Sequence, residues 1–133
     1  ILNSLLEVNC YAILSLRILN QTHLINANNF IDFIFSCQNI DGGFIGKPFV
    51  TGLDKYFDTS TMDNTYYAIS TLNALLGGDW SLHSSDKSVA INYINDRQLP
   101  SGGFNNDNET IYFDSIPTFE DNLLSAYYCL KSF

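Results

Sequence analysis

The stretch Arg97–Phe104, RQLPSGGF, repeats a pattern that the chain has already used at Gln38–Phe44, QNIDGGF. In both copies a glutamine precedes a double glycine and a phenylalanine, and the two glutamines lie 60 residues apart. A fixed period of this length is the signature of repeated structural units. We therefore expect a chain built of similar units.

A second pattern occurs three times and supports the same period. It covers 7–16 (EVNCYAILSL), 63–72 (DNTYYAISTL) and 121–130 (DNLLSAYYCL), at offsets of 56 and 58 residues. Each copy begins with an acidic residue, has leucine at its tenth position and has alanine at its sixth, namely Ala12, Ala68 and Ala126. Apolar residues at spacings of three and four in these copies predict a helix in each.

Each full unit is predicted to contain a second helix, at about 27–37 in the first and about 86–96 in the second. Ser84 or Ser85 is the expected N-cap of the latter helix, because serine side chains accept hydrogen bonds from the first free amides. The Gly77-Gly78 pair should end the helix before it, since glycine takes a positive φ at little cost.

These elements define an all-α fold class, built of helical-hairpin repeats. We expect a single segment over 1–133, with one repeat at about 1–60, a second at about 61–118 and half a repeat at about 119–133. Longer loops at 45–62 and 105–119 should join the units.

Composition limits the kinds of partner. The 133 residues carry a net charge of −8, which argues against nucleic acid and against an anionic membrane surface. No apolar run is long enough for a transmembrane segment. Cys10, Cys37 and Cys129 form no CxxC pair, so we expect buried, reduced thiols and a cytoplasmic location.

The run Phe30–Gly46 (FIDFIFSCQNIDGGFIG) resembles the helix, glutamine and GGFxG segment of the protein prenyltransferase β-subunit repeats, and Arg97–Phe104 resembles that family more closely. The terpenoid cyclases of the same superfamily are matched more loosely. The resemblance implies an α/α toroid, in which an inner ring of helices surrounds a central cavity and an outer ring covers it. Two and a half hairpins would form an arc of such a toroid.

An arc leaves apolar surface at both ends, because each hairpin of a stack covers its neighbour. At the first end we expect Leu5, Leu6, Ile13 and Leu14 to be uncovered, and at the other Leu123, Leu124, Tyr127 and Phe133. The expected partner is therefore the rest of a longer toroid or a second copy in a homo-oligomer.

The repeated glutamines and glycines also have a structural interpretation. A glutamine at a helix end can bond the backbone of a neighbouring helix, and Phe44 or Phe104 can fill the junction between hairpins. Gln38 and Gln98 are therefore assigned to the fold and not to catalysis.

The resemblance also implies where zinc would lie. Protein prenyltransferases hold it with a carboxylate, a cysteine two residues later and a histidine on a later inner helix. Asp63 matches the carboxylate, but Thr65 stands at the cysteine position and Leu124 roughly at the histidine position. Neither is a zinc ligand, so we expect no metal site and no cofactor in this segment.

Asp63 is nevertheless the candidate catalytic residue. It aligns with the middle aspartate of the DxDD element with which class II terpenoid cyclases protonate an alkene, although Asn64 replaces the next carboxylate. The alternative is that Asp63, Glu7 and Asp121 only stabilise the starts of three equivalent helices.

Four aromatic residues of the inner helices are the candidate substrate-binding residues: Tyr66, Tyr67, Tyr127 and Tyr128. The resemblance implies that such side chains line a cavity for an isoprenoid, while packing alone would also explain them. The basic residues are scattered along the chain, so no diphosphate clamp is expected. His23 and His83 occupy equivalent connections and are expected at the surface.

Two functions remain open. The first is a prenyltransferase-like or terpenoid-cyclase-like toroid domain that handles an isoprenoid. The alternative is a non-catalytic toroid repeat module that binds a protein or a small ligand.

Overall fold

The computed structural model describes residues 4–48, 58–106 and 119–132, and for 119–125 it describes the backbone only. Its elements are helices and short 3-10 turns: α1 (Leu5–Ile18), η1 (Thr22–Leu24), α2 (Ala27–Ser36), α4 (Met62–Leu76), η2 (Ser81–His83), α5 (Ser84–Asp96) and α7 (Phe119–Ser132). Within these residues β-pairing is limited to isolated bridges at the glutamine–phenylalanine turns. The predicted all-α class is confirmed.

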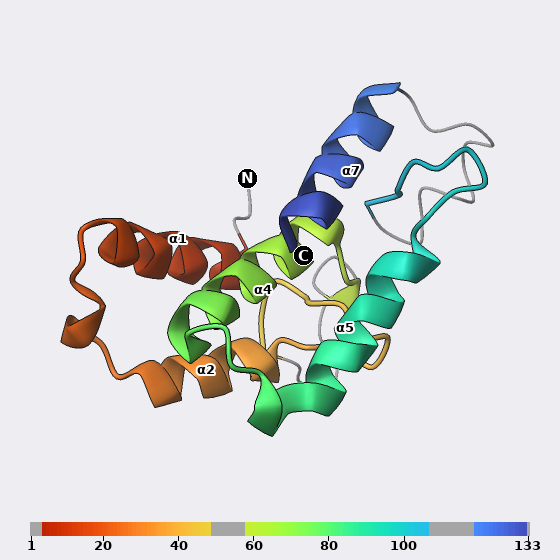
Figure 1. Ribbon diagram of the computed structural model, residues 1–133. Coiled ribbons are helices and arrows are strands. Elements are labelled where there is room, and N and C mark those ends of the chain that lie inside the picture. Colours follow the sequence, from red (N-terminus) through yellow and green to blue (C-terminus); the bar gives the residue numbers. More distant parts are fainter. Residues whose placement is uncertain (1–3, 49–57, 107–118, 133) are drawn as a thin grey trace.

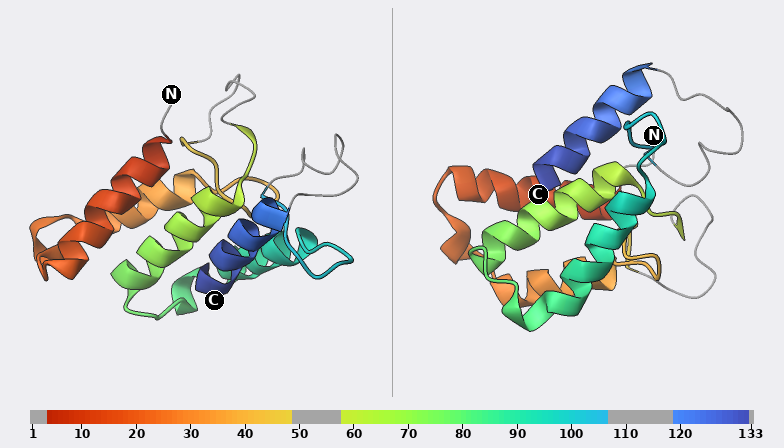
Figure 2. Two further views of the ribbon diagram at one scale, coloured as in Figure 1. Left: turned by 90° about the horizontal axis from the view of Figure 1, so that it is seen from above. Right: turned by 45° about the vertical axis from the view of Figure 1, so that its right-hand side comes forward.

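The helices form two layers (Figure 1). Helices α1, α4 and α7 lie side by side and run in the same direction, with α4 packed against both neighbours (Figure 2). Helices α2 and α5 run the opposite way on the other side of this inner layer (Figure 2). This is the hairpin arrangement that the repeat predicts.

Local chemistry sets most helix ends. The side chains of Ser4, Asn26 and Thr61 cap α1, α2 and α4 by accepting the amide three residues on. Gly77, with φ of 63°, ends α4 as expected. Asp63 lies in the first turn of α4, where its charge favours the helix dipole, while Thr61 is the cap.

The predicted serine cap of α5 is wrong. The N-cap position is His83, without a side-chain cap hydrogen bond, and Ser84 is already helical. The turn η2 leads directly into α5, so no extended residue precedes the helix to act as a cap.

The first glutamine turn joins two hairpins. Gln38 donates through Nε2 to the carbonyl of Asp86 in α5 and to that of Gly42, both at 3.1 Å. Phe44 is buried at the same junction. Gln98 in the second copy is exposed and bonds only within its own turn, to Gly102 at 3.4 Å. The structural interpretation of Gln38 is therefore confirmed, and no described hairpin follows to engage Gln98.

The main core lies between the layers and takes residues from α1, α2, α4 and α5. The three cysteines are free and buried, as predicted. Burial raises the pKa of Cys10 to about 11 and of Cys37 to about 12, so both are neutral thiols near neutral pH.

The repeat shows which surfaces the arc leaves open. Ala68 and Thr71 in α4 are fully buried, whereas Ala12 and Ser15, their equivalents in α1, are exposed. Leu130 in α7 is 75% exposed, although its equivalent Leu72 is fully buried. Both ends of the described layer therefore lack a covering neighbour.

The predicted list for the first end was partly wrong. Leu5 is exposed, but Leu6 and Ile13 are buried and Leu14 is half-buried, because the same helix must also pack against α4. At the second end Tyr127 is exposed, while the side chains of Leu123, Leu124 and Phe133 lie outside the described residues. No helix in the described part of the chain is long and apolar enough to cross a membrane.

Candidate functional site

Five tyrosines from three inner helices meet on one surface, which we call the tyrosine cluster: Tyr11, Tyr66, Tyr67, Tyr127 and Tyr128. Neighbouring ring centroids lie between 4.8 Å (Tyr11 to Tyr67) and 6.4 Å (Tyr66 to Tyr127), within the range of aromatic contacts. The four tyrosines chosen from the sequence are thus brought together.

The cluster lies on the face of α1, α4 and α7 that the outer helices leave uncovered. Tyr11 and Tyr127 are about half exposed, and Tyr66, Tyr67 and Tyr128 are half-buried. This uncovered face, the open face below, is the surface that would line the centre of a closed ring.

Sequence reasoning missed Tyr11. A signal was present, because Tyr11 follows Glu7 by four residues as Tyr67 follows Asp63. The two tyrosines therefore occupy the same repeat position on adjacent helices, and their hydroxyl oxygens lie 2.9 Å apart.

The hydroxyl groups form a directed chain of hydrogen bonds. Tyr11 donates to Oε1 of Glu7 on its own helix. A phenol has a single proton, so Tyr67 must donate to Tyr11 across the α1–α4 boundary. The Tyr128 ring packs against Tyr67 at 6.1 Å between centroids, so the cluster also reaches α7.

These phenols are held in the neutral form. Burial is the main reason that the pKa of Tyr67 and that of Tyr128 are each raised to about 12. For Tyr11 the hydrogen bond to the Glu7 carboxylate is the main reason for a raised pKa. Each hydroxyl therefore remains a hydrogen-bond donor at physiological pH.

Asp63 is half-buried in the first turn of α4, on the same side of the helix as Tyr66 and Tyr67, which follow it by three and four residues. Its charge is one of the smaller causes of the raised pKa of Tyr128. Its Oδ1 accepts the backbone amide of Asn64 at 3.0 Å. The Asn64 side chain accepts a hydrogen bond from Ser4 at 2.9 Å and so ties α4 to the start of α1.

Thr65 does not fit a zinc site. Its side chain is fully buried, accepts the Phe44 amide at 3.1 Å and donates to the Thr61 carbonyl at 2.7 Å. Both hydrogen-bonding functions of the hydroxyl are used in packing the glutamine turn against α4. In the described segments no three His, Cys, Asp or Glu side chains gather as metal ligands would. The Leu124 side chain lies outside those segments.

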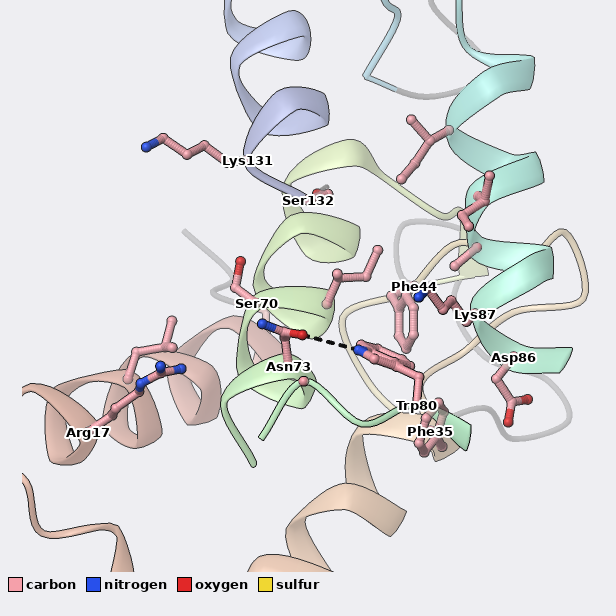
Figure 3. Close-up of a pocket in the computed structure, with 16 residues that line it drawn as sticks. Arg17, Phe35, Phe44, Ser70, Asn73, Trp80, Asp86, Lys87, Lys131 and Ser132 are labelled. Atoms are coloured by element: carbon pink, nitrogen blue, oxygen red, sulfur yellow. Dashed lines mark hydrogen bonds between the residues drawn. The ribbon is translucent and has the colours of Figure 1, made fainter. Parts of the chain in front are cut away.

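A separate cavity of about 470 Å³ lies between the layers, beneath the end of α7 (Figure 3). None of the tyrosine cluster lines it. Its walls include Ala90 on α5 and Trp80, whose indole donates to Asn73 at 3.2 Å. Ala90 occupies the position that Phe30 fills in the first repeat, so a smaller side chain leaves this space.

The basic residues are less scattered in space than in sequence. Arg17, Lys87 and Lys131 all line this cavity. Figure 3 shows the Lys87 amine directed inward beside Phe44 and the Lys131 amine directed away. They do not converge on one point as a diphosphate clamp requires.

The two histidines do not form a pair. His23 is exposed as expected. His83 is only half exposed, because its ring stacks on Phe35 at 4.4 Å between centroids and its Nδ1 lies 3.6 Å from Asp86.

Comparison with known proteins agrees with this architecture. Residues 3–122 match the family model described as the prenyltransferase alpha-alpha toroid domain. The chain is also 34% identical over 77 residues to the pea (Pisum sativum) protein named protein farnesyltransferase subunit beta. That match covers 58% of this chain and 16% of the pea protein, so the chain spans only a small part of this relative.

Proposed function

Because this chain belongs to the prenyltransferase alpha-alpha toroid family, we propose that it is part of a protein prenyltransferase-like subunit whose tyrosine cluster binds an isoprenoid chain. The tyrosine cluster is the observation that carries the proposal. It offers a continuous aromatic surface, built from three helices, on the face that would line the ring.

The chemistry of that surface suits an isoprenoid. Aromatic rings offer large apolar area at a small cost in side-chain entropy, so they can cover the methyl-branched chain. The hydrogen bonds among the hydroxyls hold the rings in place before a ligand arrives, which lowers the ordering cost of binding.

Asp63 is the proposed catalytic acid. Its position supports the assignment, since Asp63 precedes Tyr66 and Tyr67 by three and four residues and so lies on the same side of α4. Replacing Asp63 by asparagine should then abolish turnover and leave isoprenoid binding nearly unchanged.

The proposed partners follow from the uncovered ends of the arc. We propose that Ala12, Ser15 and Leu130 pack against further hairpins of a longer toroid or of a second copy. The buried thiols support a cytoplasmic location.

A non-catalytic toroid module is the second candidate, and Thr65 is the observation that favours it. At this position a hydroxyl replaces the zinc-binding thiolate, and it already accepts one hydrogen bond and donates another within the fold. We expect elemental analysis after dialysis against zinc to find no tight equivalent per chain. One tight equivalent would contradict this expectation and favour zinc-dependent prenyl transfer.

Binding of farnesol and of farnesyl diphosphate to the purified protein tests the isoprenoid proposal. The double variant Tyr66→Ala/Tyr128→Ala should weaken both ligands by about tenfold or more, because two ring surfaces are lost. Ile40→Ala is the matched control, since Ile40 is fully exposed in the first glutamine turn. Equal affinity in all three proteins, with circular dichroism showing intact helices, would refute the proposal.

A further inference from the structure

The direction of the hydroxyl chain gives the open face a second property. The hydroxyl protons of Tyr67 and Tyr11 are both committed toward Glu7. The faces of the five rings carry the negative part of the aromatic quadrupole. The cluster is thus rich in electrons.

Two carboxylates add formal charge to this face. Glu7 accepts one hydrogen bond from Tyr11, and a carboxylate can accept several, so it retains free acceptor capacity. Asp63 lies on the same side of α4 as Tyr66 and Tyr67, which follow it by three and four residues. Both charges belong to a chain whose net charge is −8.

A cation of the chain itself already lies over one of these rings. The Lys131 ammonium is 5.9 Å from the centroid of the Tyr127 ring, within the range of a cation–π contact. This contact is independent of the hydroxyl chain, because Tyr127 takes no part in it.

We propose that the tyrosine cluster binds an organic cation, an ammonium or guanidinium group, over the rings of Tyr11, Tyr67 and Tyr128, with Glu7 as its counter-ion. Aromatic rings around a cation, with a nearby carboxylate, are the arrangement by which proteins recognise alkylated ammonium groups. Binding of the cation does not require that the same surface bind an isoprenoid.

Choline and its neutral carbon isostere 3,3-dimethylbutan-1-ol separate charge from shape. Titrated into the purified protein by calorimetry or by NMR of the tyrosine rings, choline should bind about fivefold or more tightly than the isostere. Equal affinity for the two, or binding of neither, would overturn the proposal. Because this comparison uses the unaltered protein, it does not depend on how any variant folds.

Glu7→Gln tests the counter-ion. It keeps a hydrogen-bond acceptor for Tyr11 and removes the charge, so choline affinity should fall several-fold while circular dichroism shows intact helices. Asp32→Asn is the matched control, because Asp32 is an exposed carboxylate on the outer helix α2. Unchanged choline affinity in a folded Glu7→Gln protein would contradict the role of Glu7.

The source of the cation is addressed by a second pair of probes. If the cation comes from a polypeptide, a short peptide with one lysine should bind more tightly than the same peptide with acetyl-lysine. If the cation comes from a small molecule, choline should bind more tightly than either peptide. If the peptide, its acetylated form and choline all bind with the same affinity, the cluster does not recognise positive charge and the proposal is wrong. If the protein binds choline more tightly than 3,3-dimethylbutan-1-ol but does not bind farnesol, only the isoprenoid proposal is refuted.

Discussion

Glu7 anchors the hydrogen bonds of the open face, which run through Tyr11 to Tyr67 and so join α1 to α4. An acid at the start of a repeat was expected to favour the helix dipole, and Glu7 does lie in the first turn of α1. Its hydrogen bond to Tyr11, four residues on, adds a second role, since residues at this spacing are neighbours on a helix.

Alkaline titration should show the protected tyrosines directly. The pKa of Tyr67 and that of Tyr128 are about 12 in the folded protein, against a usual value of 10.0. The unfolded chain therefore loses protons before the folded chain does. The stability that these groups contribute is fully present below pH 10 and is lost as the pH rises from about 10 to about 12.

Ultraviolet absorbance of tyrosinate measures this shift. The folded protein should show a late-ionising fraction that the urea-unfolded protein lacks, and Tyr67→Phe/Tyr128→Phe should remove it. A titration curve that is the same for folded and unfolded protein would show that the two hydroxyls are not protected.

At the scale of elements, the glutamine turns show what joins one hairpin to the next. Gly42 has φ of 89°, and a Cβ there would lie 2.1 Å from the carbonyl oxygen of Val89 in α5. Gly102 in the second copy has φ of 91° but nothing within 4 Å of a Cβ. The two glycines thus share a backbone conformation, but only Gly42 lies in close contact with a neighbouring helix.

Alanine substitutions at Gly42 and Gly102 should separate the cost of backbone strain from the cost of a steric clash with α5. Gly102→Ala should lower the free energy of unfolding by about 1 kcal/mol, because only the left-handed conformation is penalised. Gly42→Ala should cost about 3 kcal/mol or more, since α5 must also move. Urea denaturation measures both, and equal losses would argue against the close approach of this turn to α5.

The cavity beside α5 gives a prediction in the opposite direction. Ala90 is almost fully buried and borders the cavity where the first repeat has Phe30. Ala90→Leu should raise the free energy of unfolding by about 1 kcal/mol, because the added side chain fills empty space.

Thermal and urea unfolding of Ala90→Leu provide the measurement, with Asn92→Leu as control. Asn92 is exposed on the same helix, so leucine there should leave stability within about 0.5 kcal/mol of the original. A loss of stability in Ala90→Leu would mean that the space cannot accept a branched side chain.

At the scale of the whole molecule, two and a half hairpins leave both ends of the inner layer uncovered. Leu130 and the Ala12 face of α1 have buried equivalents in α4, which has a neighbour on each side. Covering such surface stabilises by roughly 25 cal/mol per Å². Screening by physiological salt limits the opposition from the net charge of −8.

We therefore expect the 133-residue chain to associate in solution. Light scattering at about 100 μM should report a mass above that of one chain, and Ser15→Glu, on the uncovered face of α1, should lower it. Asn28→Glu, at an exposed position of α2, should have no effect. A stable monomer at this concentration would show that the ends need no partner.

The repeat pattern by itself determined the hairpin fold, most helix ends and the burial of the cysteines. These depend on the spacing of apolar residues, on capping side chains and on glycine, all of which act within a few residues. The pairing of the outer and inner layers followed from the period, and family membership agrees with it.

Tertiary packing decides which faces and side chains meet. It places Tyr11 beside Tyr67, buries Leu6 and Ile13 and leaves a cavity at Ala90. These features depend on contacts between residues that are far apart in sequence, whereas α5 begins without a serine cap because the turn η2 leads directly into it. Such contacts are set by packing against neighbouring helices, and spacing along one helix does not specify them.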